Sequence, residues 1–541
     1  MAQVTNEKII WGAEDWYGGF DDINPSSPTL YSLKANKNTL VYAQNCDPYR
    51  NPGYISVGAD TVSVTLDPVN DGGINGVLRN SVSWNFTTGS PRGIYDIGLT
   101  STGRLIMFNS TTTVDTTSDS FYKTITPHAG HSTVVGRDII KYNAKIGGTS
   151  YPCFLYSWTD NTDWDIGIAN GTSPDAMGFD DDMMSTSAAS PLAGSDLTDG
   201  QNVEHPMVVG DDDVLYIGSG RYLHGYDGQV GNGGTFYSKV LTLPLGYIIT
   251  SMQKYNGYLV IFAHNNDTTA GTLTALGYSD SKAFFWDYLS LDPTKVVDLK
   301  DNKCSESFLY QNTLGVFTAG RSRDNRFPSF SKCQLFNGQG FEPIVYFSED
   351  IPIKGGVEVA GDQLIWNSVG KIYSYGNNLG LPKVLTWLTS GTTSSSGMLN
   401  SHTRTILASS GTLTAGGLYK LTGYKATGEL ITKTVEPAFP EGKKGRIKYV
   451  QVKYGQVEAT PGRKVDIKLR YNRGASTITL ATDDYPADET ELIKKFEHDT
   501  SGAELPSFTD VSLDLVWKTG TDNTDAPLIA EIEIFYELIN I

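Results

Sequence analysis

Three oxygen-bearing side chains at alternate positions form the segment best suited to hold a metal ion. Asn161, Asp163 and Asp165 are followed by Gly167. Calcium loops use this spacing because alternate side chains converge on the ion and a glycine allows the sharp turn. The distal glutamate that completes such a loop is missing, so we favour a polar turn between strands. We therefore predict that the fold requires no cofactor, with calcium at Asn161, Asp163 and Asp165 as the alternative.

Catalytic motifs are the second kind of chemistry that the sequence could carry. His128 and His131 form a His-x-x-His pair, but no glutamate follows in a helical frame and no third ligand is near. The chain has no Gly-x-Ser-x-Gly nucleophile motif, no phosphate-binding loop and no convincing pair of acids. We predict that the protein is not an enzyme. The alternative is a glycoside hydrolase, which would need two carboxylates about 5–10 Å apart.

A basic segment stands out against an acidic chain. The 541 residues contain 42 Lys and Arg against 60 Asp and Glu, a net charge of −18, so the chain is poorly suited to grip a nucleic-acid backbone. Residues 441–470 nevertheless carry nine Lys and Arg against three Asp and Glu. We predict a docking face for an acidic neighbour at Lys443, Lys444, Arg446 and Lys448. A solvated strand face is an equally weighted alternative.

Short apolar runs separated by polar turns indicate that the candidate residues named above lie on β-strands or on the turns between them. Runs of four to six apolar residues alternate with clusters of Gly, Asn, Asp and Ser, and helical periodicity is almost absent. One short helix after Asp488, over 491–496, is the exception we consider. A turn followed by a leucine-led strand recurs at Leu105, Leu155, Leu215, Leu259, Leu314 and Leu364, in steps of 50, 60, 44, 55 and 50 residues.

This repeat and the pattern that follows it predict the architecture. A four-stranded blade needs roughly 40–50 residues, so we predict an all-β chain with a six- or seven-bladed β-propeller over 61–437. An N-terminal arm and first strand would occupy 1–60. After Pro437 the alternation becomes regular, as in Val465, Ile467 and Leu469, and this predicts a C-terminal β-sandwich over 438–541. A stack of irregular sandwiches is the alternative to the propeller.

Cysteine spacing and hydropathy bear on the compartment. Cys46, Cys153, Cys304 and Cys333 are too scattered for a disulfide framework, so we expect reduced thiols and synthesis in a cytoplasm. No apolar run reaches the 18 residues of a spanning helix, and the first ten residues do not form a signal peptide.

Four segments make the chain resemble a family of phage virion proteins. They are Tyr17–Asp22, Asn45–Tyr54 with its Pro-Gly pair, Tyr278-Ser279-Asp280 followed by Trp286, and the basic strand Lys443–Val450. The chain is similar in these segments to the tail hub, nozzle or packaged-DNA stabilisation proteins of short-tailed phages. The resemblance implies a propeller with a further β domain, a structural role and no catalytic residues.

The function expected from this resemblance is that of a virion protein in a phage tail. Copies of the chain would form a ring, a hexamer being one order it could take, that continues the DNA channel below the portal and its adaptor and helps retain and release the genome. Its partners would be itself, the portal-adaptor, other tail proteins and DNA that passes without sequence-specific binding. The alternative is a receptor- or glycan-binding propeller at the tail tip.

Overall fold

The fold is taken from a computed structural model of the chain. It describes the residues in the following ranges: 7–12, 16, 40–47, 51, 53–64, 76–86, 93–108, 120–126, 134–146, 149–160, 164–171, 177–183, 204–228, 236–265, 280–320, 331–347, 350–360, 363–368, 371–378, 381–389, 398–400, 406–412, 415–422, 424–432, 434–457, 462–520 and 525–541.

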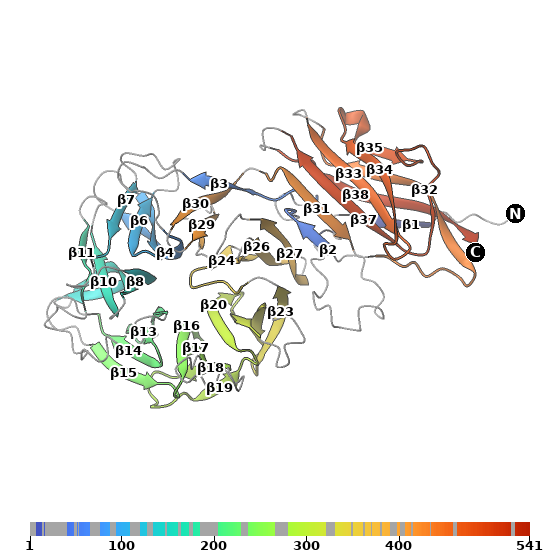
Figure 1. The fold of residues 1–541 in the computed structure, drawn as a ribbon. Coiled ribbons are helices and arrows are strands. Elements are labelled where there is room, and N and C mark those ends of the chain that lie inside the picture. The colour runs from blue at the N-terminus through green and yellow to red at the C-terminus, as the bar shows by residue number, and fades with distance from the viewer. Residues whose placement is uncertain are drawn as a thin grey trace. The chain divides into compact units, whose positions relative to one another are not determined.

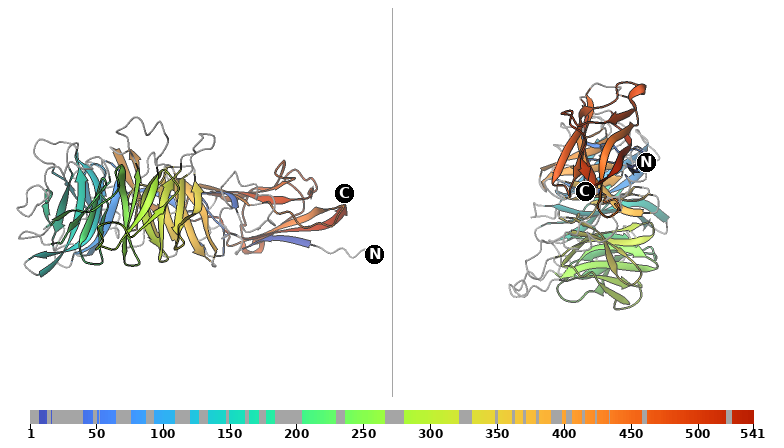
Figure 2. Two further views of the ribbon diagram at one scale, coloured as in Figure 1. Left: turned by 90° about the horizontal axis from the view of Figure 1, so that it is seen from below. Right: turned by 90° about the vertical axis from the view of Figure 1, so that its right-hand side faces the viewer.

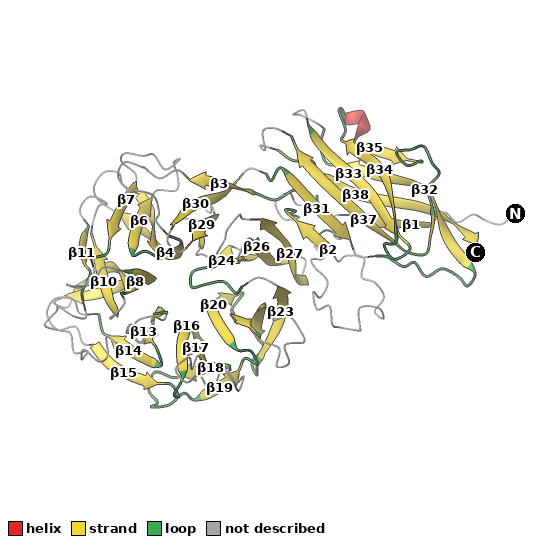
Figure 3. Ribbon diagram, viewed as in Figure 1, coloured by secondary structure: helices red, strands yellow, loops and turns green. Residues whose placement is uncertain are grey.

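The chain is all-β, as the sequence predicts. Apart from strands, the described residues contain one short 3-10 helix, Glu489–Glu491, drawn red in Figure 3. Asp488 caps this turn by accepting a hydrogen bond from the backbone N of Thr490. The predicted helix over 491–496 is wrong beyond this turn, because Ile493–Phe496 forms strand β35 and pairs with β32 (Lys443–Tyr454).

Two compact units divide the chain. The propeller-like unit comprises residues 63–371 and 390–420, and the terminal unit comprises residues 1–62, 372–389 and 421–541. Each unit is therefore built from segments that are distant in sequence.

In the described residues, the propeller-like unit consists of six four-stranded sheets and one two-stranded hairpin (Figure 1). Strands that are consecutive in the chain pair antiparallel within these sheets, as β8 (Val135–Ile146) does with β9 (Thr149–Thr159). The first three sheets contain β4 (Leu78–Phe86), β5 (Gly93–Thr100), β6 (Arg104–Phe108) and β7 (Ser120–Thr124); β8 (Val135–Ile146), β9 (Thr149–Thr159), β10 (Trp164–Asn170) and β11 (Gly178–Asp180); and β12 (Met207–Val209), β13 (Leu215–Ser219), β14 (Tyr222–Tyr226) and β15 (Phe236–Thr242).

The remaining sheets of this unit repeat the plan, and Figure 2 shows their strands standing side by side. They contain β16 (Tyr247–Tyr255), β17 (Tyr258–Asn265), β18 (Ser281–Trp286) and β19 (Lys295–Asp298); β20 (Lys303–Tyr310), β21 (Thr313–Ala319), β22 (Ser331–Phe336) and β23 (Phe341–Phe347); the hairpin of β24 (Val357–Ala360) and β25 (Gln363–Ser368); and β28 (Met398–Asn400), β29 (Ile406–Thr412), β30 (Ala415–Thr422) and β3 (Asp60–Val64).

The first strands of these sheets form a closed series of neighbours. Strand β4 contacts β8, and the contacts continue through β12, β16, β20, β24 and β28, which in turn contacts β4. The last sheet combines β28, β29 and β30 with β3, which precedes β4 in the chain, so it joins the two ends of the repeat array. Buried apolar side chains from successive sheets form the clusters between them, one of which joins Leu155 to Leu215.

The terminal unit contains two further sheets. The first has the order β1 (Glu7–Trp11), β38 (Ile529–Asn540), β32 and β35, with β36 (Ser507–Phe508) also paired to β32. The second runs through β26 (Lys371–Asn378), β27 (Leu381–Thr389), β2 (Leu40–Gln44), β31 (Thr427–Thr432), β37 (Val511–Thr519), β33 (Arg463–Tyr471) and β34 (Ser476–Asp484).

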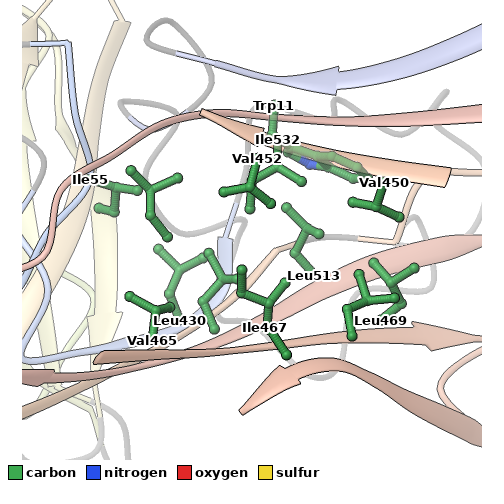
Figure 4. Packing of buried hydrophobic residues seen from close by; sticks show 14 of the residues in the cluster. Trp11, Ile55, Leu430, Val450, Val452, Val465, Ile467, Leu469, Leu513 and Ile532 are labelled. Atoms are coloured by element: carbon green, nitrogen blue, oxygen red, sulfur yellow. The ribbon is translucent and has the colours of Figure 1, made fainter. Parts of the chain in front are cut away.

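Apolar side chains from both sheets of the terminal unit form one buried cluster. Figure 4 shows Val450, Val452 and Ile532 on one side and Ile467 and Leu513 on the other, pointing toward one another. The alternation in the sequence of β33 thus places the side chains of Val465, Ile467 and Leu469 on the face of the strand that points into this cluster. All three are fully buried there.

The unit boundaries differ from those expected from the sequence. An arm at 1–60 and a sandwich beginning at 438 were the expectation, whereas residues 1–62 and 421–437 belong to the terminal unit. Strand pairing explains the difference. Strand β1 pairs antiparallel with β38 from Glu7 opposite Tyr536 to Trp11 opposite Ile532, and β31 pairs with β37.

Candidate functional sites

The predicted calcium segment is only partly within the described residues. Asn161 and Asp163 lie outside them. Asp165 lies on β10 with no exposed surface, and its Oδ1 accepts a hydrogen bond of 2.6 Å from the backbone N of Ile166. Over the described ranges, no group of three or more His, Cys, Asp or Glu side chains is placed to hold a metal ion. The prediction that the fold needs no cofactor, with calcium as the alternative, therefore stays a prediction. His128 and His131 also lie outside the described residues.

The predicted docking residues lie together at the start of β32, but two of their charges are already paired. Arg446 Nη2 lies 2.5 Å from Glu504 Oε2, and Lys448 Nζ lies 2.7 Å from Glu537 Oε1. Glu537 belongs to β38, which is the neighbour of β32 in the sheet. The excess of positive charge counted along residues 441–470 is therefore reduced by glutamates that the fold brings from a distant part of the chain.

Lys443 and Lys444 differ from these two residues. Lys443 Nζ donates to the amide Oδ1 of Asn540 at 2.5 Å, and it forms no ion pair with a carboxylate of the described residues. Lys444 stands opposite Ile539 of β38, and no ion pair joins it to a carboxylate of the described residues. Positive charge on this strand is thus concentrated at its first two residues.

Further along β32 the same sheet is stabilised by aromatic and ionic contacts. Tyr449 stacks on Phe535 with ring centroids 4.4 Å apart, and Lys495 Nζ lies 4.1 Å from the centre of the Tyr449 ring. Lys453 Nζ pairs with Glu531 Oε1 at 2.5 Å. Cross-strand pairs of this kind stabilise a sheet, so this part of the strand has its partners within the chain.

A second candidate site is a set of buried and partly buried charged side chains on the first strands of the propeller-like unit and on the segments that lead into them. We call it the inner-strand cluster. It consists of Arg79 of β4, Arg137 and Asp138 of β8, Glu204 before β12, Glu306 of β20, and Lys354 before β24. The three cations balance the three carboxylates, so the cluster is neutral when all six are ionised.

Ion pairs connect these residues across neighbouring sheets. Glu204 Oε1 lies 3.1 Å from Arg79 Nη1 and 3.8 Å from Arg137 Nη1. Lys354 Nζ lies 3.3 Å from Glu306 Oε1 and 3.9 Å from Asp138 Oδ2. The two residues of each ion pair belong to different sheets, and each lies on the first strand of its sheet or just before it. The cluster therefore links strands that are far apart in sequence.

Hydrogen bonds complete the surroundings of Asp138. Its Oδ1 accepts a bond of 2.6 Å from Asn80 Nδ2, and its Oδ2 accepts one of 2.8 Å from the backbone N of Met207. The hydroxyls of Ser251 and Ser307 make a further link of 2.5 Å between β16 and β20. Polar contacts therefore continue from one first strand to the next.

Burial sets the protonation behaviour of the cluster. Burial raises the pKa of Glu306 from its ordinary 4.5 to about 7; Lys354 opposes this rise, and the charge of Asp138 adds to it. Burial also raises the pKa of Asp138, against the influence of Lys354 and Asn80. Burial alone would lower the pKa of Lys354, but the two carboxylates raise it above its ordinary value. Lys354 is thus held as a cation between two carboxyl groups that resist ionisation.

This geometry indicates that the inner-strand cluster has a structural role, in which its ion pairs hold neighbouring sheets together. Glu306 is 6% exposed and its carboxyl group is paired with Lys354, so it is not presented to a substrate in solution. Sequence reasoning missed the cluster because each repeat contributes only one or two of its charges. A usable signal was present, since Arg79, Asp138, Glu204, Glu306 and Lys354 follow one another at intervals of roughly one or two repeats.

Comparisons with known proteins add the following. No family model matches the chain, and no curated protein matches it. Among solved structures, the chain is similar to the RRP9 WD40 repeats, at 9% identity and a TM-score of 0.39, over 68% of this chain and 99% of that one. It is also similar to the exo-beta-1,3-galactanase from Phanerochaete chrysosporium, at 11% identity and a TM-score of 0.32, over 89% and 100%. A computationally designed protein, Ika8, gives 9% identity and a TM-score of 0.36, over 67% and 100%.

The described residues contain no helix that is long and apolar enough to cross a membrane.

Proposed function

We propose that the chain is a seven-bladed β-propeller joined to a β-sandwich. The closed series of contacts from β4 through β8, β12, β16, β20, β24 and β28 supports the blade count, because each blade contributes one innermost strand. The single apolar cluster fed by two sheets supports the sandwich.

On this architecture we propose that the protein is a structural component of a phage tail. Several copies would form a ring that continues the DNA channel below the portal and its adaptor. The observation that carries the proposal is that two of the four segments resembling this family, Asn45–Tyr54 and Lys443–Val450, come together in the terminal unit. Val57, just after Asn45–Tyr54, forms a bridge with Cys46, Ile55 pairs with Ile529 of β38, and β38 pairs with β32, which begins with the basic motif.

The charge of the chain suits a passage for DNA. A net charge of −18 repels phosphates, so DNA could slide past without being held. Screening over about 8–10 Å restricts this effect to residues on the channel wall. Copies arranged around one axis close into a ring through heterologous contacts, in which different surfaces of two copies meet.

The test is assembly of virus particles with altered docking residues. Reversing Lys443, Lys444 and Arg446 to Glu should leave the monomer folded, because these side chains are at least partly exposed. The particles should incorporate less of the protein and should leak DNA or fail to eject it. Reversal of Lys464 and Lys468, on strand β33 of the same unit, is the matched control.

Two results would contradict the proposal. One is a particle of normal composition and infectivity after the triple reversal, which would remove the docking role. The other is a protein that remains monomeric and turns over glycans or binds them at the tail tip, which would favour the alternatives of a hydrolase or a receptor-binding protein.

A further inference from the structure

A short ordered loop of the propeller-like unit presents two leucines almost completely to solvent. Leu289 is 90% exposed and Leu291 is 89% exposed, the highest values for large apolar side chains in the part of the chain that the structure describes. They lie between β18 and β19, in the segment Asp287–Thr294.

The loop is held in this shape by its own hydrogen bonds. Asp287 Oδ1 accepts bonds from the backbone N of Leu289 at 3.1 Å and of Ser290 at 2.8 Å. The indole Nε1 of buried Trp286 donates to the carbonyl of Ser290 at 2.6 Å, and the backbone N of Thr294 donates to the carbonyl of Phe285 at 2.8 Å. The leucines are therefore fixed outward by a closed loop.

The aromatic residue within the loop points the other way. Tyr288 adopts a left-handed φ of 66°, and its ring lies 5.6 Å from the rings of both Tyr216 and Trp286. It thus packs against the buried cluster of its sheet. The loop therefore packs its tyrosine inward, partly buried, and exposes both leucines.

Two carboxylates flank the leucines. Asp287 and Asp292 lie on either side of them in the loop, and the nearby Lys295 directs its Nζ to the carbonyl of Gly338, 3.1 Å away. Hydrogen bonds from Ser290 lower the pKa of Asp287, so this group is ionised at neutral pH. An apolar tip with an acidic border fits an apolar surface with a basic border, and it disfavours an anionic lipid surface.

The start of β32 offers the basic charges that such a contact needs. Lys443 and Lys444 carry charges that no carboxylate of the described residues compensates, and Lys444 stands opposite Ile539 of β38. The aliphatic stems of lysines can pack against leucine side chains while their ammonium groups meet carboxylates. Both surfaces belong to the same chain, so one copy can offer the loop and the next copy the strand.

We propose that the loop Asp287–Asp292 is a docking element that binds the Lys443–Lys444 end of β32 on a second copy of this chain. This inference rests on the proposed function, since it supplies the heterologous contact that a ring needs. It also assigns Lys443 and Lys444 a partner, where the sequence indicated only an acidic neighbour.

The test is a charge exchange followed by sedimentation velocity of the full chain over a range of concentrations. Asp292→Lys and Lys444→Glu should each weaken self-association by at least about tenfold, and the two changes in one chain should restore it, because the opposite charges meet again. Asp292 makes no hydrogen bond that shapes the loop, so the fold should be retained. Leu289→Ser with Leu291→Ser should also weaken association by at least about tenfold.

The control is Leu245→Ser, which removes a leucine that is 83% exposed on a different turn of the same unit and should leave association unchanged. A wild-type chain that stays monomeric, or single variants that associate like wild type, would overturn the inference. Binding of the monomer to neutral lipid vesicles through the two leucines would overturn it as well. An open dimer that depends on Asp292 and Lys444 would support this contact while contradicting the ring.

Discussion

The buried carboxyl group of Glu306 makes the stability of the propeller-like unit depend on pH in a specific way. The pKa of Glu306 is raised from 4.5 to about 7, mainly by burial. Each pKa unit corresponds to 1.36 kcal/mol, so this shift changes the free energy of unfolding by about 3 kcal/mol between low and high pH. Glu306 is 6% exposed, so solvent screening does not reduce the effect much.

The sign follows from which state holds the proton. Between pH 4.5 and about 7 the folded chain keeps the proton on Glu306, whereas the unfolded chain releases it. The contribution of Glu306 to stability is therefore complete below pH 4.5 and is lost as pH rises through about 7. Glu306→Gln retains the shape and lacks the titration, so the free energy of unfolding of wild type minus that of Glu306→Gln should fall by about 3 kcal/mol from pH 4.5 to pH 8.

The assay is urea denaturation of both proteins at several pH values between 4.5 and 8.5, followed by tryptophan fluorescence. Asp138 and Lys354 are present in both proteins, so their titration largely cancels in the difference. Glu342→Gln, at an exposed position of β23, should show no such dependence. A difference between wild type and Glu306→Gln that is constant across this pH range would refute the account of the inner-strand cluster.

Three further predictions concern the fold. Gly355 has a φ of 75°, and an added Cβ would lie 1.8 Å from the backbone O of Arg79, so Gly355→Ala should lower the thermal midpoint of the propeller-like unit and cost more than about 1 kcal/mol by denaturation. A fragment of residues 438–541 should show no cooperative unfolding by circular dichroism, because it lacks β1 and β31; a sharp transition would show that these strands are dispensable. Chelator and reductant should leave the thermal midpoint unchanged, since the four cysteines are buried free thiols; a drop with chelator would favour the calcium site at Asp163 and Asp165.

The repeat was predictable from the sequence because five of the sheets bury a leucine at a similar place. Leu155, Leu215, Leu259, Leu314 and Leu364 all lie on the second strand of their sheets, and all are fully buried. Leu105 does not follow this register, since it lies on β6, the third strand of its sheet. Alternation and turn residues are local signals, and they were sufficient to predict an all-β chain.

Pairing between distant segments could not be predicted in the same way. Trp11 lies in the buried cluster of the terminal unit opposite Ile532, yet nothing in residues 7–11 specifies that partner. Charge pairing between distant segments could not be predicted either. The basic residues from Lys443 to Lys448 are visible in the sequence, whereas the ion pair of Lys448 with Glu537 depends on the register between β32 and β38.

The central proposal is that several copies of this chain form a closed ring around DNA, and imaging of the native particle by cryo-electron microscopy tests it most directly. The account predicts a ring of identical copies next to the portal and adaptor, with DNA density along the axis. A single copy, or a position in a peripheral fibre away from the channel axis, would contradict it.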